Sequence, residues 1–286
     1  MVPSPGGGPA RLPPIDAETM RRLMIHEARV HGLPGRTLKD LGDAVLLHDP
    51  VDPEPFWNRV ELVKWPDDPA GFDRRLTETL VLFAAMGRQP HIWASPLYDE
   101  PADLVSRLAA NGFADLGLGD LMALADPDRL MAAAPGYLPA GVALERLSGL
   151  SESEAADAAR DVVEVLVDAF DVEPERRAPI EAETSATLRH PWFTHYLVRL
   201  DGAPAAVARR ATFDGASYLS SIGTASWARR RGLARLATVM AASDALADES
   251  DWTYLGVFSD NEAAIRLYRE IGFERIGASS PDMLLV

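Results

Sequence analysis

Residues 216–240, ASYLSSIGTASWARRRGLARLATVM, decide the fold of the second half of this chain. The stretch opens as an apolar strand, turns at three consecutive arginines and a glycine, and continues as an amphipathic helix. A helix start presents unpaired backbone N–H groups and a partial positive charge. Gly232 permits close approach of a ligand to the backbone, and the arginines add fixed charge. The run Arg229–Arg235 therefore predicts a cradle for a phosphate group, and the expected guest is a pyrophosphate.

The rest of the second half alternates strands and helices. Asp201-Gly202 and Asp214-Gly215 are strong signals for tight turns between strands. The expected order is strand Val142–Leu147, helix Ser151–Phe170, a helical stretch to Pro191, strands Trp192–Leu200, Ala205–Phe213 and Ala216–Ala225, the helix after the arginines, strand Trp252–Phe258, a helix started at Asn261 and ended by Gly272, and the last strands in Phe273–Val286.

The same order recurs about 160 residues earlier, which indicates a duplication of domain size. The earlier counterparts are Phe56–Trp65, Gly71–Gly87, His91–Leu97 and Leu104–Phe113. In the first copy, prolines and two aspartates replace the arginine turn, so it should repel a pyrophosphate. Pro101 and Leu108 also stand where the second copy has Asn261 and Tyr268. We expect the first copy to be a structural or substrate-shaping partner without a cofactor site.

Composition fits a folded protein of two domains. The chain has 286 residues, 47% hydrophobic and 25% charged, and we expect a flexible leader at 1–14 and domains at 15–137 and 138–286. It has no cysteine, and its six histidines lack metal-ligand spacing, so no metal site is expected. The net charge of −15 opposes nucleic acid and anionic membranes as partners; it either favours a cationic co-substrate or serves solubility. The start lacks a signal-peptide pattern, so the cytoplasm is the default compartment.

The order of strand, Arg-x-x-Gly-x-Ala turn, helix, strand, Asn-started helix and Leu-Tyr-x-x-x-Gly-Phe resembles the GNAT superfamily of acyl-CoA-dependent N-acetyltransferases. The resemblance covers Val142–Val286 in element order and is strongest over Ile222–Phe273. It implies a mixed α/β (α+β) fold of two tandem GNAT-like domains, each a twisted, mixed, mainly antiparallel sheet flanked by helices.

The resemblance also implies a binding site for acetyl-CoA in the second copy. The backbone of Ile222, Gly223 and Thr224 would pair with the pantetheine arm, where two parallel strands splay apart. Asn261 would touch the cofactor arm, and Tyr268 would lie near the thioester sulfur as the acid that protonates the leaving thiolate. Main-chain N–H groups of the loop would wrap the pyrophosphate; its residues are Arg229, Arg230, Arg231, Gly232, Leu233, Ala234 and Arg235.

The sequence assigns no general base. The strand Ala216–Ala225 holds no Asp, Glu or His, and Ser226-Trp227 replaces the Pro-Glu or Pro-Asp pair that the family often has before the loop. A water relay past Tyr218, Ser220 and Ser221 is one substitute. His190 and His195 either line the acceptor pocket or pack at the start of a hairpin. Acidic residues in the region that walls the acceptor site in this family suggest a cationic amine or form a solvated surface; they are Asp168, Asp171, Glu173, Glu175, Glu181 and Glu183.

The predicted function is transfer of an acetyl group from acetyl-CoA to a primary amine of a small molecule, by direct attack without a covalent enzyme intermediate. One alternative is a non-catalytic acyl-CoA sensor or assembly partner that kept the cradle. Another is an acyltransferase that uses a longer acyl-CoA, and the tandem layout is similar to that of the mycothiol synthases. The two halves resemble a pseudo-dimer, so a monomer or a homodimer is expected.

Overall fold

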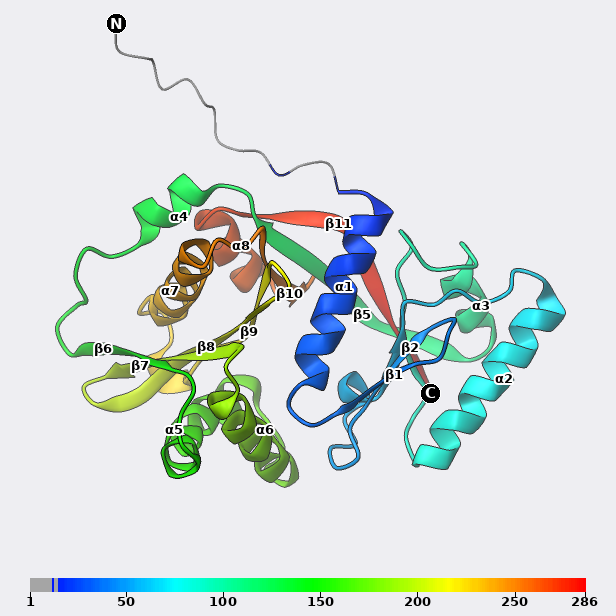
Figure 1. The fold of residues 1–286 in the computed structure, drawn as a ribbon, viewed down its shortest axis with the longest axis horizontal. Helices are drawn as coiled ribbons and strands as arrows, with labels where there is room; N and C mark the ends of the chain where they lie inside the picture. The colour runs from blue at the N-terminus through cyan, green and yellow to red at the C-terminus, as the bar shows by residue number, and fades with distance from the viewer. Residues whose placement is uncertain (1–11, 13–14) are drawn as a thin grey trace, which may run out of the picture.

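The computed structural model describes Leu12 and residues 15–286. The described strands form one mixed sheet of eleven strands in the order β1-β2-β3-β4-β11-β5-β10-β9-β8-β7-β6, with helices on both faces (Figure 1). The expected mixed α/β fold is therefore confirmed. Apart from Leu12, the leader expected at 1–14 lies outside the described residues.

The elements follow the order expected for two related halves. The first half contains α1 Ala17–Gly32, β1 Thr37–Asp40, β2 Val45–His48, the 3₁₀ turn η1 Pro55–Trp57, β3 Arg59–Glu61, α2 Pro69–Met86, β4 His91–Trp93, α3 Leu104–Ala110, β5 Phe113–Leu124 and α4 Pro127–Ala133. The second half contains β6 Val142–Leu147, α5 Glu152–Phe170, η2 Pro174–Arg176, α6 Arg177–Arg189, β7 Phe193–Leu200, β8 Ala203–Phe213, β9 Ala216–Thr224, η3 Ser226–Ala228, α7 Leu233–Ala247, β10 Trp252–Phe258, α8 Glu262–Glu270 and β11 Phe273–Leu285.

The final strand of each half joins the two sheets into one. β5 pairs antiparallel with β10, where Gly119 lies opposite Phe258. β11 pairs antiparallel with β4, where Leu284 lies opposite His91. β5 and β11 also pair with each other. Each half thus completes the sheet of the other, and this connection brings first-half residues next to any site built on β9 and β10.

Side chains of β8 alternate between two packed layers of helices. Ala208 faces a core that contains residues of α7 and α8, whereas Val207 faces α5. On β9, Leu219 faces the α7 layer and Tyr218 faces α1. Figure 1 shows α5 and α6 on the opposite side of these strands from α7 and α8. We call the side with α7 and α8 the cofactor side, and the side with α1, α5 and α6 the acceptor side.

Local sequence signals in the second half form the structures that they predict. The turn between β7 and β8 has φ of 51° at Asp201 and 85° at Gly202, the left-handed conformations that a two-residue hairpin turn requires. α5 begins with a capping box in which the side chains of Ser151 and Glu154 each bond the other residue's backbone. The turn at Asp201-Gly202 fixes the register of β7 against β8, in the sheet that carries the site.

The counterpart strands of the first half are shorter than the repeat predicts. The range 56–65 forms a 3₁₀ turn and the three-residue strand β3, because Pro55 starts a turn closed by the Asn58 N–H. The range 91–97 is a strand only to Trp93, since a turn follows in which the Asp99 N–H binds the Ser95 carbonyl at 3.1 Å. The last segment forms the single strand β11, with irregular register between Ile276 and Met283.

Candidate active site

The parallel strands β9 and β10 separate partway along their length. They pair from Ala216 opposite Trp252 to Leu219 opposite Leu255, and no further. Beyond this point β9 stays with β8, and β10 turns to β5. The two strands that the sequence predicts to splay therefore do so, and the opening between them is called the gap below.

A β-bulge lies on β9 at the gap. Its register against β8 shifts between Val207 and Arg209, and Ser221 has a φ of 51°. A non-glycine residue in this conformation carries strain, which bulges near active sites commonly show. The bulge places Ser220, Ser221 and Ile222 against a cavity, while Gly223 packs so closely that an added Cβ would lie 2.9 Å from that of Ala169.

The arginine turn stands at the start of α7, as predicted. Gly232 is the N-cap residue with a φ of 76°, and no side chain of the described residues caps the helix. Arg229 donates to the carbonyl oxygens of Thr224 at 3.4 Å and Ala169 at 3.2 Å, and Arg235 to that of Ala133 at 3.2 Å. Arg230 and Arg231 are exposed. The start of α7 thus offers open backbone donors beside positive charge.

The matching helix of the first half closes its own N-terminus. At the start of α2, the Asp68 carboxylate accepts the Gly71 N–H at 2.8 Å, where α7 has only Gly232. The backbone that follows β3 also has hydrogen-bond partners. The Glu100 N–H donates to the Val63 carbonyl, and the Glu100 carbonyl accepts from the Trp65 N–H, both at 3.0 Å. The first half therefore satisfies with its own atoms the groups that stand open in the second half.

A cavity of about 520 Å³ runs through the gap, with lining residues on both sides of the sheet. Asn261, Ala264 and Tyr268 of α8 line it on the cofactor side. Of the predicted cofactor-binding residues, Ile222 and Asn261 line this cavity, whereas Gly223, Thr224 and the loop 229–235 lie outside its lining. The cavity can therefore hold the reacting end of a ligand whose phosphates lie farther out, at α7.

Tyr268, the predicted acid, lies in the wall of the cavity. Its side chain is buried against the cavity, and burial raises the pKa of the phenol above its usual value. No hydrogen bond to the described residues perturbs it, so the hydroxyl is not committed to packing. Asn261 caps α8 by accepting the Ala264 N–H at 3.1 Å, which leaves its amide NH₂ available. Both side chains line the cavity, about two helical turns apart.

Residues of the first half form much of the cavity on the acceptor side, and sequence reasoning missed them. These residues are His31, Glu54, Pro55, Phe56, Trp57, His91 and Leu116, and they come from α1, η1, β4 and β5. Asp282 of β11 also lines the cavity and is hydrogen-bonded to His91. The spacing of Glu27 and His31, four residues apart on a helix, is the signal that would have drawn attention to this wall.

The two histidines of the hairpin start have different positions. His195 lines the cavity and bonds the Thr187 hydroxyl at 2.8 Å, and burial together with nearby Arg209 lowers its pKa to about 3. It is therefore neutral at physiological pH. His190 lies against Trp192, with ring centroids 5.2 Å apart, and does not line the cavity.

Among the acidic residues considered, Glu183 alone lines the cavity. It pairs with Arg36 and with Arg209 at 2.6 Å each. Burial opposes its ionisation, but the two guanidinium groups outweigh burial and lower its pKa to about 2. Asp168 instead binds the backbone N–H and hydroxyl of Ser226, so it fixes the turn before the arginines. The other four acidic residues do not line the cavity; they are Asp171, Glu173, Glu175 and Glu181.

Of the residues proposed for a water relay, Tyr218, Ser220 and Ser221 all line the cavity. The Ser220 hydroxyl accepts a hydrogen bond from Arg209 Nε at 3.0 Å, so its own proton is free to bind a ligand or water. Burial raises the pKa of Tyr218, so it stays a phenol.

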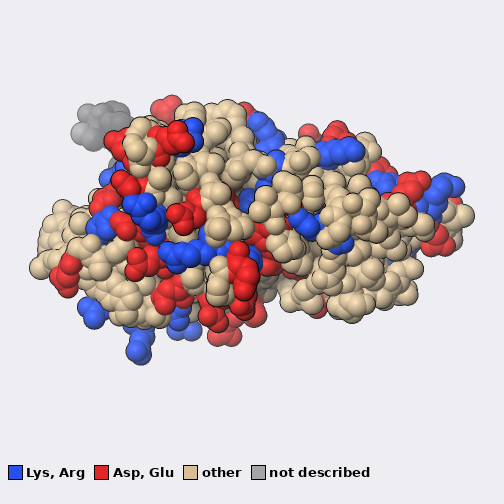
Figure 2. Space-filling view, turned by 90° about the horizontal axis from the view of Figure 1, so that it is seen from below, with Lys and Arg blue, Asp and Glu red and all other residues tan. Residues whose placement is uncertain are grey.

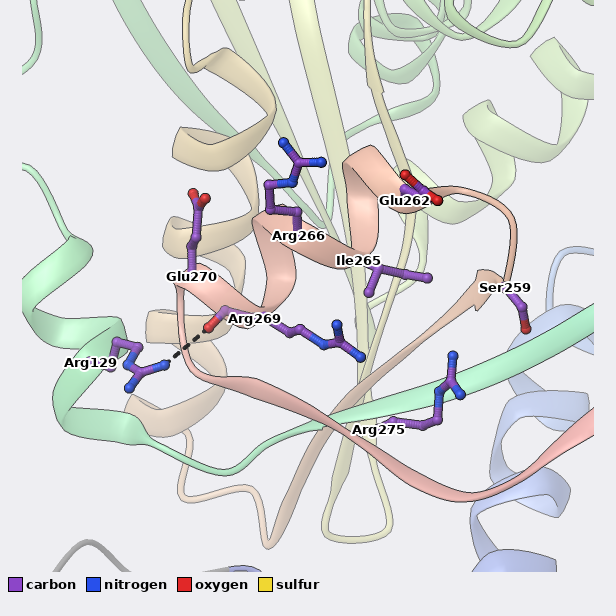
Figure 3. Close-up of a pocket in the computed structure, with 8 residues that line it drawn as sticks. All are labelled: Arg129, Ser259, Glu262, Ile265, Arg266, Arg269, Glu270 and Arg275. Carbon is purple, nitrogen blue, oxygen red and sulfur yellow. Dashed lines mark hydrogen bonds between the residues drawn. The ribbon is translucent and has the colours of Figure 1, made fainter.

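A second hollow of about 570 Å³ lies against α8 and β11 (Figure 3). Arg129 donates there to the backbone carbonyl of Arg269 at 3.3 Å, and Arg275 pairs with Asp120. None of the predicted cofactor-binding residues lines this hollow, so it is separate from the cavity in the gap. Its lining consists of Arg129, Ser259, Glu262, Ile265, Arg266, Arg269, Glu270 and Arg275.

Three wider features bear on what the protein binds. On the face drawn in Figure 2, basic and acidic side chains are interspersed, and its described residues form no broad basic area. No helix in the described part of the chain is long and apolar enough to cross a membrane. Over the same residues, no group of three or more His, Asp or Glu is placed to hold a metal ion.

Comparisons with known proteins agree with this geometry. A model of the acetyltransferase (GNAT) family matches residues 159–273. The chain is similar to the solved structure of a GCN5-related N-acetyltransferase from Kribbella flavida, with 26% identity, a TM-score of 0.65 and 96% of each chain covered. No curated protein sequence matches it.

Two further solved structures share the fold at lower identity. One is a tandem GNAT protein from the clavulanic acid biosynthesis pathway, with 18% identity, a TM-score of 0.60, and 90% of this chain and 86% of that chain covered. The other is a GCN5-related N-acetyltransferase from Sphaerobacter thermophilus, with 16% identity, a TM-score of 0.59, and coverage of 96% and 94%. The family model matches the part of the second half that carries the splayed strands and the arginine turn, and this similarity supports an acyltransferase.

Proposed function

We propose that the protein transfers an acetyl group from acetyl-CoA to a primary amine of a small molecule. The observation that carries this proposal is the cavity of about 520 Å³ through the gap, which is lined from both sides of the sheet and has Tyr268 in its wall. A donor held on the cofactor side and an acceptor held on the other side would meet there in direct contact.

The residues fit coenzyme A. The open start of α7, with Gly232 at its N-cap and Arg230 and Arg231 exposed, suits a pyrophosphate. The unpaired edge of β9 from Ser220 to Thr224 suits an arm with amide groups, which pairs as an added strand would. The bound cofactor supplies the thioester carbonyl that the amine attacks. We propose that the first half, 15–137, binds no cofactor, since Asp68 and Glu100 fill the equivalent places.

The roles of the side chains follow from their positions. Tyr268 holds the proton for the departing sulfur, and its uncommitted hydroxyl suits this role. Backbone N–H groups at the bulge of β9 are placed to stabilise negative charge on the carbonyl oxygen. The acceptor occupies the side walled by Phe56, Trp57 and Ile180, so a molecule with an apolar or aromatic body is expected there.

A thiol-release assay with acetyl-CoA and a panel of primary amines tests the proposal. Turnover with at least one amine is expected, together with direct acetyl-CoA binding by calorimetry. Tight binding without thiol release on any amine would instead support the sensor alternative. Faster turnover with a longer acyl-CoA would support the acyltransferase alternative, and absence of acyl-CoA binding would overturn both proposal and alternatives.

A further inference from the structure

A Glu–His pair on α1 lies at the acceptor side of the cavity. His31 Nε2 lies 2.7 Å from Glu27 Oε1, and the two residues are one helical turn apart. The other Glu27 oxygen accepts from Arg59 at 2.9 Å. The side chains of His31 and Glu27 are only 4% and 6% exposed, so their geometry is fixed by packing.

The surroundings select one tautomer of His31. Burial opposes ionisation of Glu27, but Arg59 and His31 outweigh it and lower the pKa of this carboxyl group. An ionised carboxylate only accepts hydrogen bonds, so the proton between the two groups belongs to Nε2. Burial also lowers the pKa of His31, although Glu27 acts in the opposite direction. The ring is therefore neutral, and Nδ1 carries a free lone pair.

Nδ1 has no hydrogen-bond partner within the described residues, although it is buried. Buried polar atoms are rarely left without a partner, and such exceptions are common where a ligand or a reaction supplies one. The ring that carries this atom lines the cavity. The free nitrogen of an oriented imidazole is the group that general-base catalysis uses.

Aromatic side chains hold the His31 ring beside the gap. Its centroid lies 5.1 Å from that of Trp57, 5.5 Å from that of Phe56 and 5.6 Å from that of Tyr218. The Tyr218 hydroxyl in turn lies over Gly256, where an added Cβ would be 3.0 Å from it. Gly256 is the first residue of β10 beyond its pairing with β9. His31 and Tyr218 thus lie side by side in the wall of the cavity next to the gap.

We propose that His31 is the general base of the acetyl transfer and that Glu27 is the residue that positions it. The assignment rests on the proposed function, and it means that the first half, which lacks a cofactor site, supplies a catalytic residue. It also explains why the strand 216–225 needs no acidic or histidine side chain of its own.

The proton balance of the step is complete. As the neutral amine nitrogen forms its bond to the thioester carbonyl carbon, one N–H proton passes to His31 Nδ1. When the carbon–sulfur bond breaks, the sulfur takes a proton from Tyr268. The proton on His31 then returns to the phenol through water, so amine and thioester give amide and thiol.

The charged and titratable groups that face His31 come from four elements. They are Glu27 on α1, Arg59 on β3, Arg209 on β8 and Tyr218 on β9. Arg59 and Arg209 favour the neutral ring, and Glu27 favours the protonated ring. Protonation of His31 at low pH would block the proton transfer, so kcat should fall on the acidic side.

The test compares His31→Gln and Glu27→Gln with His26→Gln, using acetyl-CoA and an amine that the wild-type protein acetylates. His26 is a matched control, because it is a buried histidine of the same helix that bonds Tyr254 and does not line the cavity. H31Q should lower kcat by about 10²–10⁴-fold without changing the Kd for acetyl-CoA, and it should lose the acidic limb of the pH profile of kcat. E27Q should lower kcat less and shift that limb to lower pH, and H26Q should keep both kcat and the limb.

Two further measurements protect the test against a folding defect. Added imidazole should partly restore kcat to His31→Ala, and it should not do so for H31Q. Nitrogen-15 NMR of the wild-type protein near pH 7, with H31Q to assign the signal, should show a neutral ring protonated at Nε2. A ring protonated at Nδ1 would overturn the assignment, whatever the kinetics of the variants.

The outcomes separate the inference from the proposed function. Wild-type turnover together with an H31Q variant of full kcat and unchanged pH profile would exclude His31 as the base and leave the proposed function standing. A wild-type protein that binds acetyl-CoA but acetylates no amine would overturn the proposed function itself, and the base with it.

Discussion

Arg36, which follows α1, and Glu183 of α6 form an ion pair of 2.6 Å that joins the first half to the acceptor wall of the second. The pair continues inward, because Glu183 also binds Arg209, which donates to Ser220 beside the bulge of β9. On the outer side, Arg36 lies over the ring of Trp57 at 3.8 Å. A nearly buried charged chain therefore links α1, α6 and the edge of the gap.

Glu183→Gln should destabilise the protein and disturb the acceptor side. The change leaves two buried guanidinium groups without their shared carboxylate, and breaking such a pair typically costs about 3–5 kcal/mol. Urea unfolding measures this loss, and the KM for the acceptor should rise while the Kd for acetyl-CoA stays the same. Glu175→Gln, at an exposed residue of η2, is the control and should change stability by less than about 0.5 kcal/mol. Equal effects of the two changes would contradict a role for the ion pair.

Gly232→Asp should weaken acetyl-CoA binding. It places a carboxylate at the N-cap of α7, where α2 has Asp68, and this charge repels a pyrophosphate. We expect the Kd, measured by calorimetry, to rise at least about tenfold, equivalent to about 1.4 kcal/mol.

Gly87→Asp is the matched control for this change. Gly87 also has a positive φ, 63° against 76° at Gly232, and an added Cβ meets no atom within 4 Å at either position. Both variants should lose stability, because an aspartate fits the left-handed region less well than glycine, and G87D should lose more because its charge lies at the C-terminus of α2 and not at a helix N-terminus. An unchanged Kd in G232D would place the phosphates elsewhere.

Tyr268→Phe should lower kcat without weakening the fold. The phenol has no hydrogen bond in the described part of the chain, so its loss leaves no partner unsatisfied. Removal of a general acid typically lowers a rate about 10²–10⁴-fold. The thiol-release assay with acetyl-CoA would measure this decrease in kcat. Tyr254→Phe gives the opposite pattern, because that hydroxyl donates to the Leu23 carbonyl at 2.9 Å and lies 2.7 Å from His26. It should lose about 1–3 kcal/mol of stability and keep kcat. Full kcat in Y268F would remove Tyr268 from the mechanism.

The sequence predicts the second half well because its signals are local. The Asp201-Gly202 turn, the cap at Asn261 and the apolar spacing of the helix after Gly232 each depend on a few neighbouring residues. The element order, the splay at β9 and β10 and the open start of α7 follow from them and from the family pattern. Tyr268 is found in the same way, through its distance from the arginine turn.

The acceptor side could not be predicted in the same way, because it depends on contacts between residues far apart in the chain. The exchange of β5 and β11 places His31 and Trp57 beside Tyr218, more than 150 residues later. No local pattern encodes that pairing. The repeat indicates that the halves are related, but it does not state which face of one adjoins the cavity of the other. The first half could therefore be predicted only as a structural or substrate-shaping partner, and the residues that form the wall were not identified.

Asp99 makes the stability of the first half depend on pH. Burial raises its pKa to about 7, with nearby Glu61 acting in the same direction and the Ser95 N–H in the opposite one. The folded protein then holds a proton that the unfolded chain has released above about pH 4, so stability is greatest at low pH within this window and falls as the pH rises through 7.

Asp99→Asn keeps the shape of the side chain and removes this titration. From pH 5 to pH 8, urea unfolding should show a loss in the wild-type protein that is larger than in D99N by up to about 3 kcal/mol, because the pKa of about 7 lies about two pH units above the start of this range. Glu61, whose pKa burial also raises to about 7, is present in both proteins; because the two carboxyl groups interact, the difference reports Asp99 together with its effect on Glu61. Asp103→Asn, at an exposed residue paired with Arg107, should follow the wild-type curve, and parallel curves for wild type and D99N would show that Asp99 does not titrate in this range.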